Sequence, residues 1–312
     1  MSNPLVILCP GQGAQIVGMG KAWHDASPEA RAVFQAADRQ LGPRLGAPLS
    51  ELCFSGPPDR LNKTDVSQPA IFVASIACWK GLLAKWQFAD GEVSIAASAG
   101  LSLGEYSALV VAGAMSFEEG LELVTLRGRA MQDAAEASPG GMVALIGADE
   151  AQALAVCDRA REGDVLVCAN FNAPGQIVLS GHKVACDRAA TVAADMGFRA
   201  TPLVVAGAFH SPLMQPAADR LSRALAQAAI RVPRAPVISN VTAQAHDSES
   251  SIRTRLVEQL TSPVRWSQSC QWLGANVKAE FHELAPGKTL AGLMRRIDKN
   301  VKVITHDEPD QA

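Results

Sequence analysis

The feature that most constrains the fold of this chain is a Gly-x-Ser-x-Gly pentapeptide over residues 100–104, with Ser102 at its centre. An apolar stretch over 93–97 precedes it, and an apolar stretch suited to a helix over 105–112 follows it. In this pattern a strand turns sharply into a helix, and the turn exposes the hydroxyl beside the next backbone N–H. The sequence therefore predicts an α/β fold with Ser102 as a nucleophile, in preference to a plain strand-to-helix turn.

The composition fits a globular protein with a sizeable core. The chain has 312 residues, 48% of them hydrophobic, which allows one large domain or two modest ones. Its net charge of −3 and its lack of long basic runs give no reason to expect a nucleic-acid partner. The first residues lack the features of a signal peptide, and no stretch looks long and apolar enough to span a membrane. We therefore expect a cytoplasmic protein with no membrane partner.

Cysteine and histidine spacing gives no sign of disulfides or a metal site. The seven cysteines are scattered, odd in number and without a Cys-x-x-Cys spacing. They are interpreted as reduced packing residues. Five histidines are isolated in the sequence: His24, His182, His246, His282 and His306. No metal is predicted.

The order of elements predicts a small domain inserted into a larger one. Between 138 and 206 the pattern predicts strand 142–147, helix 149–161, strands 165–169 and 176–181, helix 183–196 and strand 199–205. This βαββαβ order is that of a ferredoxin-like unit. The larger domain then consists of 1–137 and 207–312. It begins with a strand over 5–9 and continues with helices over 28–41, 68–86 and, after a capping box at Ser116, up to 135.

His210 is the best candidate for the base that a serine nucleophile needs. Ser211 suits a helix N-cap and Pro212 the first helical position. The positive end of that helix would disfavour an imidazolium ion and keep the ring able to accept a proton. The alternative is an ordinary polar loop residue. No acidic residue stands out as a third member, so either the acid lies elsewhere or a backbone carbonyl orients the ring.

Periodicity separates two arginines on the helix that follows the capping box. Arg127 falls in the apolar row, whereas Arg129 falls on the wet side, where a pair with Asp133 is expected. An arginine on an apolar face needs a partner, and its planar fork suits a carboxylate. From periodicity alone, Arg127 either clamps a substrate carboxylate or forms an internal ion pair.

Seven segments together resemble one family. They keep the order and spacing of the malonyl-CoA:acyl carrier protein transacylases, and of the related acyltransferase domains of polyketide synthases, from about residue 5 to 305. The segments are 10–15, 67–70, 100–109, 127–132, 172–176, 207–214 and 286–290. The resemblance implies an α/β-hydrolase-like large domain that carries the small ferredoxin-like domain.

The resemblance also implies a function in fatty acid biosynthesis. Ser102 would take the malonyl group from malonyl-CoA as an ester and pass it to the phosphopantetheine thiol of an acyl carrier protein, in ping-pong fashion. His210 would be the base, and Arg127 would bind the malonyl carboxylate. No cofactor is implied, since the coenzyme A thioester is a substrate. We expect a monomer.

Four further residues receive roles from the same resemblance. The backbone N–H groups of Leu103 and Gln12 would form the oxyanion hole. The backbone carbonyl of Gln259 would orient the histidine. Phe209 resembles the malonyl-selective form of the family, in which a bulky ring crowds the α-methyl group of methylmalonyl.

Two positions depart from the family pattern. Leu101 stands where the family usually has histidine, and Ala285 replaces a common glycine. Three other functions stay open: a malonyltransferase that serves a polyketide or malonate decarboxylase carrier, an acyl hydrolase, and an inactive carrier-docking module. Basic residues near the end of the chain are either carrier contacts or a solvated face: Lys288, Arg295, Arg296, Lys299 and Lys302.

Overall fold

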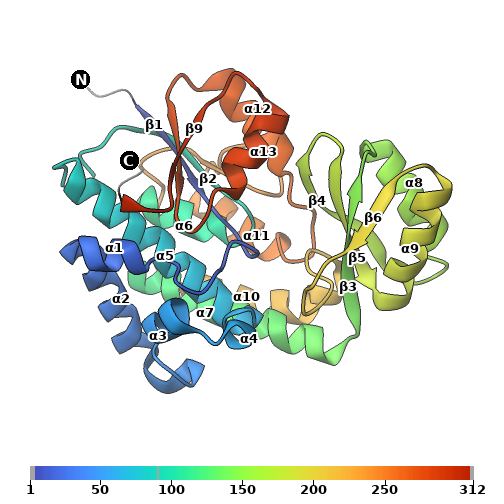
Figure 1. Cartoon of the computed structure of the whole chain (residues 1–312), viewed down its shortest axis with the longest axis horizontal. Helices are drawn as coiled ribbons and strands as arrows, with labels where there is room; N and C mark the ends of the chain where they lie inside the picture. The colour runs from blue at the N-terminus through green and yellow to red at the C-terminus, as the bar shows by residue number, and fades with distance from the viewer. Residues whose placement is uncertain (1–3, 90, 310–312) are drawn as a thin grey trace.

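The computed structural model describes residues 4–89 and 91–309, which form two lobes (Figure 1). The larger lobe contains a five-stranded parallel sheet, and the smaller lobe contains a four-stranded antiparallel sheet. The smaller lobe lies on the right of Figure 1, in green and yellow. The predicted α/β class is therefore correct, and the chain divides its sheets as the element order indicated.

The parallel sheet has the strand order β7-β2-β1-β8-β9. Its strands are β1 Leu5–Cys9, β2 Ile95–Gly100, β7 Val237–Ile238, β8 Glu280–Leu284 and β9 Val303–His306. Along β1, Ile7 and Cys9 enter the core on one face, whereas Val6 and Leu8 enter the core on the other. Since side chains alternate across a strand, a strand that is buried on both faces needs helices on both sides.

Helices supply those two layers. On one side α5 and α7 enclose the main core, and on the other α12 and α13 enclose a second core (Figure 1). The helices of this lobe are α1 Lys21–Ala26, α2 Pro28–Leu41, α3 Leu49–Ser55, α4 Pro58–Leu61, α5 Thr64–Lys85, α6 Gly104–Val111, α7 Phe117–Ala137, α10 Gln215–Gln227, α11 Glu249–Glu258, α12 Trp266–Asn276 and α13 Thr289–Ile297. Two 3₁₀ turns join them, η1 Gly42–Leu45 and η2 Pro212–Met214.

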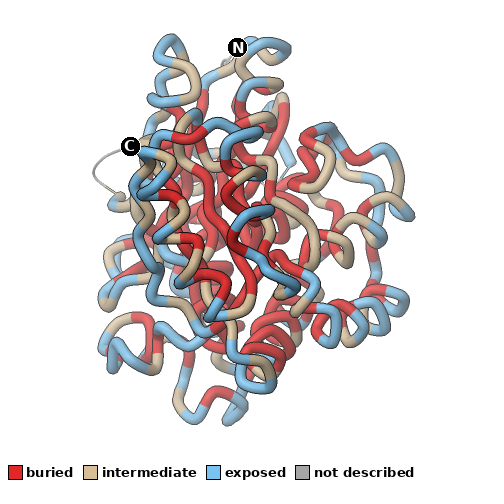
Figure 2. Tube along the Cα trace, turned by 90° about the vertical axis from the view of Figure 1, so that its right-hand side faces the viewer, coloured by how far each residue is buried: buried red, intermediate tan, exposed pale blue. Residues whose placement is uncertain are grey.

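Helix α5 corrects one expectation from the sequence. It is long and apolar enough to cross a membrane by length and composition, but 94% of its most apolar window is buried inside the protein. In Figure 2 the trace through the middle of the molecule is mostly red, the colour of buried residues. The helix begins at Thr64, four residues before the predicted start, because Gln132 on α7 accepts a hydrogen bond from the Thr64 N–H at 3.1 Å. The local sequence pattern does not predict this bond, because the two residues lie 68 positions apart in the chain.

The small sheet has the order β4-β5-β3-β6 with every neighbour antiparallel. Its elements follow the predicted βαββαβ order: β3 Gly140–Ile146, α8 Glu150–Ala160, β4 Leu166–Ala173, β5 Gln176–His182, α9 Lys183–Asp195 and β6 Arg199–Pro202. A separate apolar core lies between this sheet and its two helices. The domain boundaries stay a prediction.

Several element ends differ from the sequence prediction because tertiary contacts set them. Strand β2 runs to Gly100 instead of ending at 97, since it stays paired with β1 up to the turn. Strand β4 runs to Ala173 and bridges at Asn170 to Val264 in the larger lobe. Strand β6 ends at Pro202, before the fully exposed Val204.

Two smaller predictions can be compared with the structure. Only one of the two bonds of the capping box predicted at Ser116 is present, and the cysteines are packing residues as predicted. The Ser116 hydroxyl accepts the Glu119 N–H at 3.1 Å, but within the described residues Glu119 returns no side-chain bond to Ser116. All seven cysteines are free and buried. The described part of the chain has no cluster of three or more residues that could hold a metal.

Candidate active site

Ser102 occupies a tight turn between the last residue of β2 and the first residue of α6. Its φ of 53° lies in the left-handed region, which costs a non-glycine residue about 1–3 kcal/mol. The two glycines of the motif are required by close approach. A Cβ on Gly100 would lie 1.9 Å from the backbone carbon of Gly104, and one on Gly104 would lie 2.1 Å from the carbonyl oxygen of Cys9. The packing of β1, β2 and α6 therefore enforces the strained serine.

His210 lies between β6 and η2 and reaches Ser102 from across the site. Its Nε2 is 2.8 Å from the Ser102 Oγ, and its Nδ1 is 2.7 Å from the backbone oxygen of Gln259 at the end of α11. Because a carbonyl oxygen only accepts, Nδ1 carries the proton of the neutral ring and Nε2 is left to accept from the serine. A backbone carbonyl, rather than an acidic residue, thus orients the histidine.

The environment of His210 keeps its ring neutral. Burial is the main reason that the pKa of His210 falls to about 4, and the nearby positive charge of Arg127 lowers it further. The hydrogen bond to Gln259 opposes both effects. The direction agrees with the sequence analysis, but the causes are burial and Arg127. The turn that follows Ser211 is only the short 3₁₀ turn η2.

Arg127 projects from the buried face of α7 and contacts Ser102. It is 1% exposed, and its Nη2 donates to the Ser102 Oγ at 3.1 Å and to the Gln259 Oε1 at 2.8 Å. Its Nη1 donates to the Gln68 Oε1 at 2.7 Å. Arg129 instead is exposed and pairs with Asp133 at 2.8 Å, as predicted.

The acceptors around Arg127 are neutral. No carboxylate lies within ion-pair distance of its guanidinium among the residues that the structure describes, and its buried Nε has no hydrogen-bond partner there. The ring of Tyr106 lies 5.6 Å from the guanidinium carbon. Of the two interpretations that periodicity left open, the geometry disfavours a direct internal ion pair. A buried cation with an unused donor therefore lies beside Ser102.

Two backbone N–H groups belong to residues at the Ser102 turn: Leu103 follows Ser102, and Gln12 follows Gly11, where a Cβ would lie 2.1 Å from the Leu101 carbonyl oxygen. Within the described part of the chain, the N–H groups of Leu103 and Gln12 donate no hydrogen bond. The N–H of Ser102 itself is used, since it donates to the Asn240 Oδ1 at 2.6 Å. The residue after a serine nucleophile usually supplies one oxyanion donor, which is the position of Leu103.

Phe209 and Leu101, two apolar residues expected beside the site, pack against different cores. Phe209 is 5% exposed and packs into the main core beside the histidine it precedes. Leu101 is partly buried and packs against the second core. Its apolar side chain leaves the bond between Ser102 and His210 intact.

Sequence reasoning missed four polar residues that surround the site. Gln68 holds Arg127, while Glu105, Asn240 and His246 form a hydrogen-bonded group beneath Ser102. Gln68 and Glu105 lie in family-like segments, yet nothing local assigned them a role. The available signal was a polar residue within an apolar, buried helix, as in α5 and α6.

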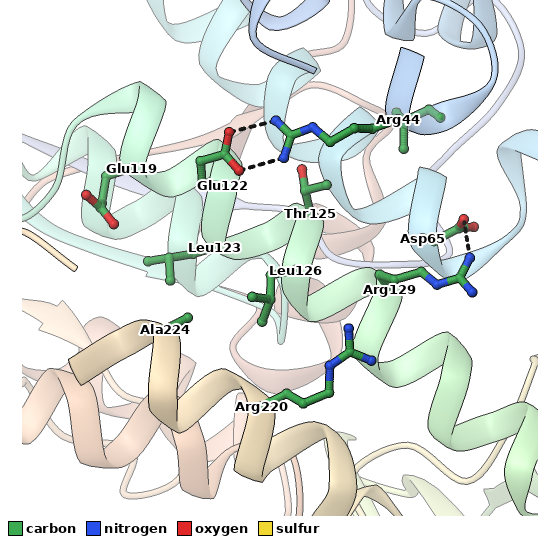
Figure 3. A pocket seen from close by; sticks show the side chains of 11 residues that line it. Arg44, Asp65, Glu119, Glu122, Leu123, Thr125, Leu126, Arg129, Arg220 and Ala224 are labelled. Carbon is green, nitrogen blue, oxygen red and sulfur yellow. Dashed lines mark hydrogen bonds and ion pairs between the residues drawn. The ribbon is translucent and has the colours of Figure 1, made fainter. Parts of the chain in front are cut away.

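The cavity in Figure 3 is separate from this site. Its volume is about 530 Å³, and it lies between α7 and α10, with none of the residues that bond Ser102 in its lining. Part of its charge is paired, because Arg44 contacts Glu122 at 2.7 Å and Arg129 lies 3.9 Å from Asp65 (Figure 3), while Arg220 pairs with Asp133 outside the lining. It offers no nucleophile. The five basic residues proposed as carrier contacts are all exposed: Lys288, Arg295, Arg296, Lys299 and Lys302.

The chain is similar in sequence to known proteins over almost its whole length. Residues 6–306 match the acyl transferase domain family. The malonyl CoA-acyl carrier protein transacylase of Escherichia coli is 40% identical over 301 residues, which cover 96% of this chain and 94% of that protein. The protein of the same name from Bacillus subtilis is 39% identical over 99% of this chain and 95% of its own length.

Solved structures that resemble this one are also of malonyl transacylases, as are the relatives found by sequence. The malonyl-CoA:acyl carrier protein transacylase of Xanthomonas oryzae superposes with a TM-score of 0.92 at 40% identity, and the match covers 100% of this chain and 97% of that one. A malonyl-transacylase solved in complex with a type II polyketide acyl carrier protein also gives a TM-score of 0.92, at 35% identity, over 99% of this chain and 97% of that one.

Proposed function

Because the chain belongs to the malonyl-CoA:acyl carrier protein transacylases of the acyl transferase domain family, we propose that it transfers malonyl from malonyl-CoA to the phosphopantetheine thiol of an acyl carrier protein. One observation carries the proposal. Ser102 is hydrogen-bonded both to a neutral histidine and to a buried arginine that has no carboxylate partner among the described residues.

The reaction uses the same groups in two half-reactions. His210 removes the proton of Ser102 as its Oγ attacks the thioester carbonyl, and the N–H groups of Leu103 and Gln12 stabilise the oxyanion. The proton then passes from His210 to the sulfur of coenzyme A, which leaves. In the second half-reaction His210 deprotonates the carrier thiol, and the thiolate attacks the malonyl ester carbonyl. The Ser102 Oγ then leaves and takes the proton from His210, which restores both groups.

Arg127 and Phe209 select the acyl group in this proposal. The guanidinium pairs with the malonyl carboxylate, whereas an acetyl group brings no charge to pair with it. The buried ring of Phe209 crowds a substituent on the α-carbon. The acyl hydrolase and the inactive docking module are less well supported. A hydrolase has no need of a buried arginine, and an inactive module has no need of the Ser102–His210 bond.

The remaining parts of the proposal concern setting and fold. We propose a role in fatty acid biosynthesis, with a polyketide carrier as the alternative that the polyketide complex favours. A cytoplasmic location is supported by seven free, buried cysteines. We propose a monomer that needs no cofactor. The larger lobe has a parallel sheet and, after β2, the tight turn over 100–104, which we call the elbow; both support an α/β-hydrolase-like lobe. The βαββαβ order and the strand order β4-β5-β3-β6 support a ferredoxin-like smaller lobe.

Transfer to a carrier thiol is tested by intact-mass analysis. Holo acyl carrier protein is mixed with malonyl-CoA and the protein, with acetyl-CoA in a parallel reaction. We expect rapid formation of malonyl-carrier and little acetyl-carrier. Apo carrier, which lacks the thiol, should gain no mass. Release of free malonate without carrier loading would support the hydrolase instead, and no reaction with either donor would support the docking module.

The fall of the reaction rate at acid pH should report the protonation of His210. Since the base must be neutral, acylation of Ser102 is expected to be constant above about pH 5 and to fall as the pH drops through the His210 pKa of about 4. Rapid-quench measurement of malonyl-Ser102 between pH 3.5 and 8 checks this. Replacing Arg127 with methionine removes a charge that lowers this pKa, so the fall should move to higher pH, whereas Arg129→Met should not move it. A fall near pH 6.5 in the unmodified protein would contradict the prediction.

A further inference from the structure

The backbone ladder under Ser102 ends before the turn that it supports. Strand β7 pairs with β2 through Ser98 with Val237 and Ala99 with Ile238, and no later pair follows in this ladder. Gly100 and Ser102 therefore have no β7 backbone partner on this side of the elbow. A strained serine needs surrounding contacts that hold it in place.

The side chain of Asn240 takes the place of the missing backbone partner. Its Nδ2 donates to the Gly100 carbonyl oxygen at 2.7 Å, and its Oδ1 accepts the Ser102 N–H at 2.6 Å. One carboxamide thus binds the peptide groups on both sides of Leu101, as the N–H and C=O of one residue of an extended, parallel β7 would do. Because a carbonyl only accepts and an N–H only donates, the orientation of this amide is fixed.

Asn240 is itself held through its backbone. The residue is fully buried, its N–H donates to the Glu105 Oε2 at 3.1 Å, and its carbonyl oxygen accepts the Arg265 N–H at 2.8 Å. These bonds join the end of β7 to α6 and to the segment before α12. Asn240, whose side chain clamps the elbow, is therefore held by two further parts of the lobe.

Glu105 links this clamp to the rest of the site. Its carboxyl is fully buried and accepts from Gln259 Nε2 at 2.7 Å, and its other oxygen lies 2.8 Å from His246 Nε2. With its nitrogen turned toward Glu105, Gln259 presents its Oε1 to Arg127. The same acidic group therefore sets the positions of Asn240 and of the amide that holds Arg127.

We propose that Asn240 is a positioning residue that keeps Ser102 in its reactive conformation by continuing the β2–β7 ladder through its side chain. The inference rests on the proposed function, in which Ser102 is the nucleophile. Without the carboxamide, the Ser102 N–H is left buried and unpaired, and the left-handed turn loses its support. A misplacement of about 1 Å at a reacting group can lower a rate by about 10²-fold.

Asn240→Asp tests the clamp because its two protonation states differ in what they can bond. A protonated carboxyl reproduces both bonds, since its O–H donates to Gly100 and its C=O accepts from Ser102. An ionised carboxyl only accepts, so it opposes the Gly100 carbonyl. Full burial beside Glu105 and that carbonyl raises the pKa of the introduced carboxyl, while Arg127, His210 and His246 lie across Gln259 and Glu105 from it.

The measurement is the rate of Ser102 modification, followed by intact mass with malonyl-CoA and with phenylmethanesulfonyl fluoride, an uncharged serine reagent. For Asn240→Asp we expect both rates to be about 100-fold below those of the unmodified protein at pH 8 and within about 10-fold of them at pH 5. His210 is still neutral at pH 5, since its pKa is about 4. Asn276→Asp, an exposed change on α12, should match the unmodified protein at both pH values.

Other outcomes decide the matter differently. Equal rates at pH 8, or an equal loss at both pH values in a folded variant, would mean that the introduced carboxyl keeps one protonation state between pH 5 and pH 8, and Asn240→Ala then decides the inference. If Asn240→Asp does not fold, Asn240→Ala decides it: about 100-fold slower labelling at both pH values supports the clamp, and unchanged labelling refutes it. If the unmodified protein transfers no malonyl but the sulfonyl fluoride rates still follow the expected pH pattern, the proposed function fails while the role of Asn240 stands.

Discussion

Replacing Ser102 with alanine is expected to lower malonyl transfer by at least about 10⁴-fold, to the level that binding groups alone support. The reason is that the variant loses the atom that would carry the malonyl ester, while His210 and Arg127 each lose one contact. The measurement is the rate of malonyl-carrier formation by intact mass, together with the mass of the enzyme after exposure to malonyl-CoA. The variant enzyme should gain no malonyl mass.

Ser107→Ala is a matched control for this change. Ser107 lies on α6, five residues after the nucleophile, and its buried hydroxyl has no partner among the described residues. Its removal leaves the elbow and His210 in place, so transfer should remain within about 3-fold of the unmodified rate, because the change touches none of the reacting groups. Malonyl-carrier formation by a folded Ser102→Ala protein at the unmodified rate would exclude Ser102 as the nucleophile.

Replacing Arg127 with methionine is expected to convert a malonyl-selective protein into an unselective one. Loss of one partner from a buried charge pair costs about 2–5 kcal/mol, so malonyl kcat/KM should fall roughly 30- to 5,000-fold. Acetyl kcat/KM should change much less, because an acetyl group has no carboxylate to pair. The measurement is the ratio of the two kcat/KM values with a common holo carrier.

Arg129→Met is the control, since Arg129 lies on the same helix but faces solvent and pairs with Asp133. Its selectivity should stay unchanged. Labelling of Ser102 by an uncharged sulfonyl fluoride in the Arg127 variant shows that the serine and histidine still act together. An equal loss of malonyl and acetyl transfer in a folded Arg127→Met protein would mean that the arginine supports the serine alone and does not select the acyl group.

Local patterns were sufficient to predict the elements that carry the site. The Gly-x-Ser-x-Gly turn requires small residues at Gly100 and Gly104, and the structure shows why, since a Cβ at either position would overlap backbone atoms. Helical periodicity alone separates the buried Arg127 from the exposed Arg129. These features depend on neighbours within one or two turns of chain, so the sequence expresses them directly.

Contacts between distant segments were not predictable in this way. The pKa of His210 is lowered mainly by burial and by Arg127, a residue on α7 far earlier in the chain. The extra length of α5 depends on a bond to Gln132, and the extra length of β4 on a bridge to Val264. Each depends on which surfaces meet after folding, and no local preference encodes that.

Local sequence patterns specify the α/β class, the strained serine turn and the βαββαβ order of the smaller lobe. The family resemblance adds the residues expected around Ser102. How Ser102 is held depends instead on contacts between distant segments of the folded chain. Asn240 lies 138 residues after Ser102, and His246 lies 141 residues after Glu105, so these groups meet only because the end of β7 packs beside α6. Hydrogen bonds between buried polar groups depend on distance and direction in space, which the folded chain alone supplies.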